Sequence, residues 1–160
     1  MGNIYRAGDP DYFDAMTPKE LGWLQASVRE TRPGWNTGVI VMGDDPLDST
    51  APAAVLLYIA PGKTLRRHAH DCFRVEVVIK GSVDVGGGQI LYPGDVSTAS
   101  PGEFYGPHTA GPEGCLSVEI FSTAAGLDPY APDDIEGDDA AFEEKRRAII
   151  ARAKAELGLK

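Results

Sequence analysis

Glycine and proline residues divide the middle of this 160-residue chain into short segments. Between residues 53 and 121 the breaks fall at Pro61-Gly62, Gly81, Gly86-Gly87-Gly88, Pro93-Gly94, Pro101-Gly102 and Gly111-Pro112. The segments between them are strand-like, and no helical segment separates one from the next. The pattern therefore predicts an antiparallel β-sandwich or barrel over residues 53–125.

Residues 1–52 are expected to form an N-terminal extension. The run Thr17-Pro18-Lys19-Glu20 offers a capping hydroxyl, a proline at the first helical position and a glutamate three residues after the cap. A short helix is predicted to begin there. Two segments, 26–31 and 38–42, carry enough valine and isoleucine for strands and flank a turn-rich stretch, so they predict a hairpin.

Residues 126–160 predict an acidic linker followed by a helix over 138–157. Four apolar residues fall near one face of that helix: Phe142, Ile149, Ala153 and Leu157. Glu143 stands four residues before Arg147 on the polar side, a favourable spacing for an ion pair. We expect this helix to pack on the barrel or on a second subunit.

Composition excludes some classes of function. The chain has 24 acidic and 15 basic residues, a net charge of -9 and a pI of about 4.7, which disfavours binding to nucleic acids and anionic membranes. No apolar run approaches the ~20 residues that span a bilayer. The two cysteines and the absence of a leader pattern indicate a single-domain cytoplasmic protein without disulfides.

All three histidines stand where a metal site would need them. His68 and His70 are separated by one residue, and His108 lies in a second cluster of glycines and prolines. Alternate side chains of an extended strand share a face, so His68 and His70 can offer imidazole nitrogens to one ion. The three histidines therefore predict a mononuclear site for a divalent transition metal (Fe, Zn, Ni or Mn).

Two motifs surround these histidines. The first runs from Gly62 through His68-Ala69-His70 to Gly81, and the second runs from Pro93-Gly94 to His108. Together they resemble the two-part signature of the cupin superfamily, over roughly residues 53–121. The resemblance implies a double-stranded β-helix, an all-β jelly-roll barrel, here with an N-terminal extension and a C-terminal helix.

One position departs from the cupin pattern. Arg74 stands where the family usually has a metal-binding glutamate, and a guanidinium has no lone pair to give to a metal. Strand alternation places Glu76 on the same face, two residues further on. Glu76 is therefore either a fourth metal ligand or the ion-pair partner of Arg74, and Arg74 is either that partner or an anchor for a substrate carboxylate or carbonyl.

Two further residues are candidates for catalysis. Glu103 precedes His108 by five residues, and its carboxylate is either a base or hydrogen-bond partner near the metal or part of an exposed turn. Tyr105 is the better pocket candidate, because its hydroxyl can orient a substrate oxygen. The opposite face of the Arg74 strand carries Val75, Val77 and Ile79, and an apolar face of this kind must be covered. Since cupins commonly pair in this way, a homodimer is expected.

Similarity to three-histidine dicarbonyl-cleaving dioxygenases implies an enzyme acting on a small dicarbonyl, enol or carboxylate substrate. Cupin cyclases, isomerases and lyases would use a similar ion as a Lewis acid and form the alternative. The run from His108 to Cys115 also resembles the cupin domain of zinc-binding anti-sigma factors. That similarity keeps open a non-catalytic zinc sensor or a small-molecule binding module.

Overall fold

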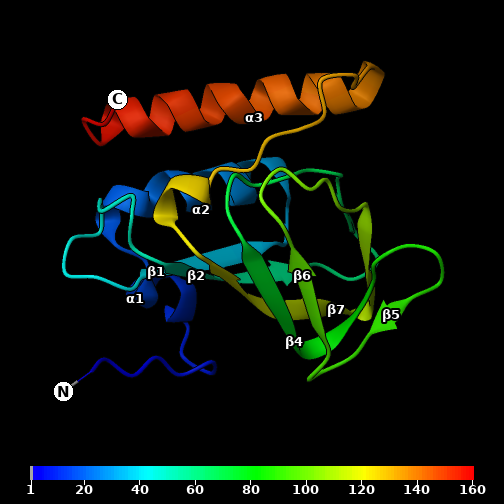
Figure 1. The fold of residues 1–160 in the computed structure, drawn as a ribbon. Helices are drawn as coiled ribbons and strands as arrows, with labels where there is room; N and C mark the ends of the chain where they lie inside the picture. Colours follow the sequence, from blue (N-terminus) through cyan, green and yellow to red (C-terminus); the bar gives the residue numbers. More distant parts are fainter. Residues whose placement is uncertain (1) are drawn as a thin grey trace.

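A curved antiparallel sheet forms the body of the computed structural model, which describes residues 2–160 (Figure 1). Its strands run in the order β1-β2-β7-β4-β5, with β3 paired to β7 and β6 paired to β4. Their bounds are β1 (Asn36–Val41), β2 (Ala53–Ile59), β3 (Thr64–Leu65), β4 (Arg74–Asp84), β5 (Ile90–Leu91), β6 (Val96–Ala99) and β7 (His108–Phe121). Every pairing is antiparallel, so the predicted all-β architecture is confirmed.

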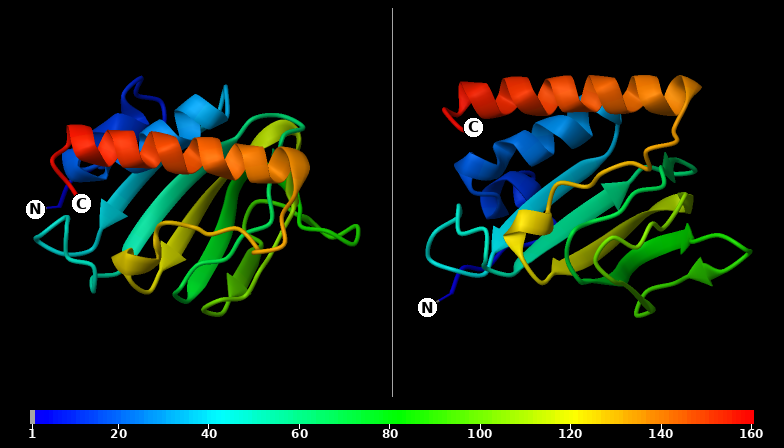
Figure 2. Two further views of the ribbon diagram at one scale, coloured as in Figure 1. Left: turned by 90° about the horizontal axis from the view of Figure 1, so that it is seen from above. Right: turned by 45° about the horizontal axis from the view of Figure 1, so that its top comes forward.

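Helices cover one side of this sheet, as both views in Figure 2 show. The long C-terminal helix, α3, packs on α2, and α2 lies on the β1 side of the sheet. Their bounds, with those of the short helical turns, are α1 (Tyr12–Met16), η1 (Lys19–Leu21), α2 (Gly22–Thr31), η2 (Ala124–Gly126) and α3 (Gly137–Glu156). None of the described helices is long and apolar enough to cross a membrane.

The predicted N-terminal hairpin is wrong. Residues 26–31 belong to α2, and β1 pairs with β2 instead. The helix wins because Leu24 and Val28, four residues apart, both pack against the buried clusters of the core. Tertiary burial thus overrides the strand preference of a few β-branched residues.

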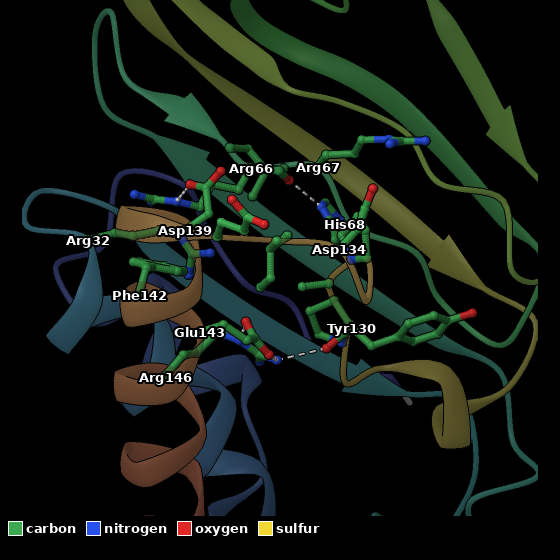
Figure 3. A pocket seen from close by; sticks show the side chains of 16 residues that line it. Arg32, Arg66, Arg67, His68, Tyr130, Asp134, Asp139, Phe142, Glu143 and Arg146 are labelled. Carbon is green, nitrogen blue, oxygen red and sulfur yellow. Dashed lines mark hydrogen bonds and ion pairs between the residues drawn. The ribbon is translucent and has the colours of Figure 1, made fainter.

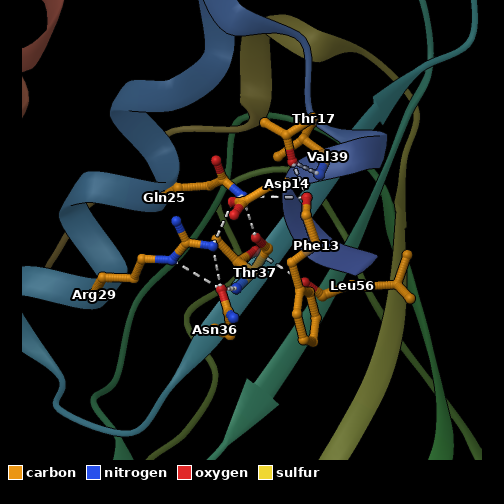
Figure 4. Close-up of polar contacts among 9 residues, drawn as sticks. All are labelled: Phe13, Asp14, Thr17, Gln25, Arg29, Asn36, Thr37, Val39 and Leu56. Atoms are coloured by element: carbon orange, nitrogen blue, oxygen red, sulfur yellow. Dashed lines mark hydrogen bonds and ion pairs between the residues drawn. The ribbon is translucent and has the colours of Figure 1, made fainter. Parts of the chain in front are cut away.

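A helix does follow Thr17, as predicted, but Thr17 does not cap it. Its hydroxyl donates to the carbonyl of Phe13 and accepts the N–H of Val39, which ties α1 to β1 (Figure 4). Gln25 of α2 reaches the same place, where its Nε2 donates to the carbonyl of Thr37 at 2.9 Å. These bonds fix α2 against the edge of the barrel.

The predicted C-terminal helix is confirmed as α3. Ile149 and Ala153 are buried, and Glu143 pairs with Arg147 at 3.0 Å. The helix packs mainly on α2, and its buried residues join a core cluster that includes Phe121 of β7. α3 therefore packs chiefly on α2 rather than directly on the barrel, which it reaches only through that cluster.

The polar and apolar faces of β4 are inverted relative to an ordinary sheet. Arg74 and Glu76 point inward and are only 2% and 4% exposed, whereas Val75 and Ile79 are 37% and 46% exposed. A polar interior is costly unless its groups are partnered, so it indicates a site rather than a plain core. The outer apolar face is uncovered in the single chain, and the homodimer stays a prediction.

Candidate functional site

The histidines lie at one end of the barrel interior. His68 and His70 are in extended backbone just before β4, where His68 bridges to Tyr105, and His108 is the first residue of β7. The rings of His68 and His70 are 5.2 Å apart, and His70 and His108 are each 5% exposed. Two imidazoles that share one ion through nitrogens at ~2.1 Å have ring centres about 5 Å apart, so the spacing of the first two suits a metal.

Backbone carbonyls hold both of these imidazoles in one tautomer. Nδ1 of His68 is 2.7 Å from the carbonyl oxygen of Arg66, and Nδ1 of His70 is 2.6 Å from that of Gly126. A carbonyl oxygen only accepts, so each Nδ1 must carry the hydrogen. Each Nε2 is left with a free lone pair, which is the arrangement of metal-binding histidines.

The histidines are neutral at physiological pH. Burial lowers the pKa of His68 to about 3 and that of His108 to about 4, and it also lowers the pKa of His70. The positive charge of Arg74 acts in the same direction on all three. Neutral imidazole is the form that binds a metal.

We expect these histidines to make the metal-free protein acid-sensitive. An unfolded histidine takes up a proton below about pH 6.5, while a folded one with a lowered pKa does not. Stability is therefore complete above pH 6.5 and falls as the pH decreases, by up to about 1.4 kcal/mol per pH unit for each histidine. Urea unfolding between pH 7 and 5 measures how steeply the free energy of unfolding changes with pH. In His68→Asn this slope should be smaller by an amount that corresponds to nearly one proton. The same slope in His68→Asn as in the wild type would contradict the lowered pKa of His68.

Tyr105 lies beside all three histidines. Its ring centroid is 4.5 Å from that of His68, 5.5 Å from that of His108 and 6.3 Å from that of His70. The hydroxyl is buried and has no hydrogen-bond partner among the described residues. Burial, reinforced by Glu119, raises the pKa of Tyr105, so the phenol keeps its proton. The structure places the Tyr105 ring against the histidines, and its role in orienting a substrate stays a prediction.

The three histidines of the predicted metal centre are not equally well placed to bind an ion. His68 and His70 have the tautomer, charge and spacing of ligands, as described above. Within residues 2–160, however, no group of three or more His, Cys, Asp or Glu side chains is arranged to hold an ion. Two histidines therefore fit a metal as they stand, and participation of His108 stays a prediction.

Arg74 forms a buried cluster with two glutamates. Its Nε donates to Glu119 Oε2 at 2.7 Å, and its Nη2 lies 2.8 Å from Glu76 Oε2 without the geometry of a hydrogen bond. Ser117 also donates to Glu76, at 3.1 Å. Of the two alternatives for Arg74, the structure shows the internal ion pair. Glu76 contacts Arg74 and Ser117, so the structure shows its ion-pair alternative, and a role as a fourth metal ligand stays a prediction.

Opposing effects set the charges of this cluster. Burial alone would raise the pKa of Glu119, but the charge of Arg74 and its hydrogen bond hold that pKa below its usual range. Burial and the neighbouring Glu119 raise the pKa of Glu76. Arg74 thus holds Glu119 ionised, while Glu76 is the carboxyl that more readily takes up a proton.

Glu119 is the functional residue that sequence reasoning missed. It alternates with Val118 and Ile120, and the apolar pair would ordinarily be assigned to the interior. In the structure Glu119 is 4% exposed and Ile120 is 41% exposed. The sequence did carry one signal for Glu119. The strand around Arg74 places charged residues inward and apolar residues outward, and β7 follows the same pattern because Glu119 pairs with Glu76 of β4.

Glu103 does not reach the site. It is exposed, and its carboxylate accepts the backbone N–H of Ser100 at 2.8 Å within its own turn. The catalytic reading of Glu103 is therefore corrected to a turn residue, the second of the two alternatives.

The motif positions decide the fold. Gly81 takes a φ of +78° within β4, Gly94 takes a φ of +94° in the turn before β6, and His108 opens β7, all within one antiparallel barrel. The fold is the antiparallel β-barrel that the resemblance to cupins implies. The two motifs that resemble the cupin signature lie on strands that pair with each other, and their three histidines lie beside the same tyrosine, Tyr105.

Comparisons with known proteins give similarities of fold. No family model and no curated protein matches the sequence. Among solved structures, the KdgF of a Halomonas species is 20% identical, with a TM-score of 0.47 over 64% of this chain and 84% of that one. The DMSP lyase DddQ of Ruegeria pomeroyi is 16% identical, with a TM-score of 0.49 over 64% and 54%. An acetylacetone dioxygenase of Acinetobacter johnsonii is 20% identical, with a TM-score of 0.41 over 54% and 59%. Similarities of this size assign neither a substrate nor a metal.

Proposed function

We propose that this cupin is an enzyme that binds one divalent transition metal ion through Nε2 of His68, His70 and His108. The observation that supports this most directly is the pair of bonds from Nδ1 of His68 and His70 to backbone carbonyls. Those bonds leave two neutral Nε2 atoms whose lone pairs are free to bind an ion. One ion would bind both lone pairs, because the two rings have the spacing of imidazoles that share a metal.

The proposed substrate is a small dicarbonyl, enol or carboxylate compound. A bound ion would act there as a Lewis acid and, if it is iron, would also support dioxygen chemistry, which makes a dioxygenase the first choice. Cyclase, isomerase or lyase chemistry is the alternative. Tyr105 would donate its unused hydroxyl hydrogen to a substrate oxygen, because its raised pKa makes it a donor rather than a base.

Metal analysis of protein purified without a histidine tag tests this proposal. We expect about one ion per chain in the wild type and near none in folded His68→Ala or His70→Ala, because each supplies one of few ligands. Glu76→Gln is the matched control and should keep the metal, since Glu76 is engaged by Arg74. Folded wild-type protein that stays metal-free in metal-replete medium would overturn the proposal.

A second candidate is a small-molecule binding module without a metal. It is favoured by Arg74, which brings a positive charge to the position where cupins usually place a ligand glutamate. Arg74 lowers the pKa of all three histidines and would equally repel a cation. The same metal analysis separates the two candidates.

A further inference from the structure

A cavity of about 290 Å³ lies between α3, the linker that precedes it and the segment that carries His68 (Figure 3). Its walls carry an unusual number of guanidinium groups. The residues on which the inference depends are Arg32, Arg66, Arg67, His68, Phe142 and Arg146. A concave site that gathers several arginines is suited to an anion.

Two of these arginines are already partnered. Arg66 pairs with Asp139 at 2.7 Å and stacks over Phe142. Arg146 is buried and bonded to Glu143, Asp128 and the carbonyl of Pro129. Their charges are satisfied within the protein and do not require a ligand.

Arg32 differs from both. Its guanidinium lies 5.1 Å from the ring centroid of Trp35 and 4.8 Å from that of Phe142. Among the described residues, its one side-chain hydrogen bond is to the Thr31 hydroxyl at 3.3 Å. It forms no ion pair with any residue from 2 to 160. Burial, together with the charges of Arg146 and Arg66, lowers the pKa of Arg32 to about 10, so it stays protonated.

The surroundings of Arg32 leave its hydrogens available. A guanidinium has five N–H donors in one plane, and aromatic rings against its faces leave the edge free. A planar carboxylate can accept two parallel hydrogen bonds from such an edge. Arg32 is half-buried and, although Glu143 is close enough to act on its pKa, forms no ion pair with any residue from 2 to 160, so a bound carboxylate would offset the hydration that its charge has lost.

A second cavity adjoins the first on the side of the histidines. It has a volume of about 90 Å³, shares Arg32, Leu65 and His68 with the first and is also lined by His70 and Glu119. A molecule whose carboxylate meets Arg32 can therefore extend along apolar walls to the imidazoles. The two cavities together have room for a small organic acid.

We propose that Arg32 anchors the carboxylate of a small organic acid whose other end reaches His68 and His70. The chemistry at that far end rests on the proposed function, whereas the anchoring does not. Asp134 and Glu136 also line the cavity and are exposed. Their negative charges favour a monoanion over a dianion such as phosphate.

Calorimetric titration with acetate, hexanoate and benzoate tests the proposal. We expect the wild type to bind hexanoate or benzoate, and Arg32→Gln to bind it at least about tenfold more weakly, because a charge-assisted hydrogen-bonded pair is lost. Arg32→Lys keeps the charge but not the planar fork and should be intermediate. Hexanamide and inorganic phosphate should bind weakly to all three proteins.

Two controls separate anchoring from other roles. Arg29→Gln removes an exposed arginine three residues earlier, in α2, that is paired with Asp14, and it should not change the affinity. Thermal unfolding without ligand shows whether Arg32→Gln is folded. A purely structural Arg32 would give a less stable variant that binds carboxylates as well as the wild type, and this result would overturn the proposal. So would a wild type that binds none of the three acids.

The titration is repeated after removal of metal with a chelator. An Arg32-dependent affinity that persists there supports the anchor even if metal analysis has overturned the proposed metalloenzyme. If binding disappears with the metal and does not depend on Arg32, the metal and not Arg32 holds the carboxylate, and the anchor is overturned. The two proposals can therefore fail independently.

Discussion

Arg74→Met should lower the free energy of unfolding at pH 7 by about 3–5 kcal/mol, which is the usual cost of removing one partner from a buried ion pair. Glu76 and Glu119 would be left in the interior, where each is 4% exposed. Neither could keep its charge without the guanidinium. Urea unfolding monitored by circular dichroism measures the change.

The pH dependence of Arg74→Met provides a check on the cause. Without Arg74, burial raises the folded pKa of both carboxyls above the unfolded value of about 4.3. A raised pKa means that stability is complete at low pH and is lost as the pH rises through the folded pKa. The variant should therefore be less impaired at pH 5 than at pH 7.

Two control variants complete this experiment. Adding Glu76→Gln and Glu119→Gln to Arg74→Met should recover much of the loss, because no buried charge then lacks a partner. Arg29→Met breaks the exposed pair with Asp14 and should cost less than about 1 kcal/mol. If Arg74→Met were as stable as the wild type, the inward register of β4 would be wrong.

Gly81→Ala should be the second severe change, with a loss of about 3 kcal/mol or more or a failure to fold. Gly81 has a φ of +78°, and a Cβ there would collide with the backbone carbonyl of Gly114. The left-handed backbone costs an alanine about 1 kcal/mol. The collision adds more, because the partner is backbone in the paired strand β7 and cannot move aside.

Gly88→Ala isolates the backbone contribution. Gly88 has a φ of +74°, close to that of Gly81, but nothing lies within 4 Å of a Cβ built there. We expect this variant to lose only about 1 kcal/mol. Equal thermal stability of the two variants would show that β4 and β7 leave enough space at Gly81 for a Cβ.

Local patterns in the sequence determined the antiparallel strands, the helix α3 and the pairing of His68 with His70. Each depends on residues close together along the chain: turn glycines, a helical period, and alternation in extended backbone. The same local evidence misassigned residues 26–31, because their helical form depends on what α2 packs against.

Tertiary structure alone decided the electrostatics of the site. Arg74 meets Glu119 across 45 residues of sequence, and the register of β4 on β7 determines that pairing. Arg32 lies in a turn-rich stretch of the sequence. Its guanidinium is covered by an aromatic ring only because α3 brings Phe142 against it. The alternation of side chains along a strand and the helical repeat predict which residues share a face. The partner of a buried charge, in contrast, depends on which distant strand or helix lies beside it.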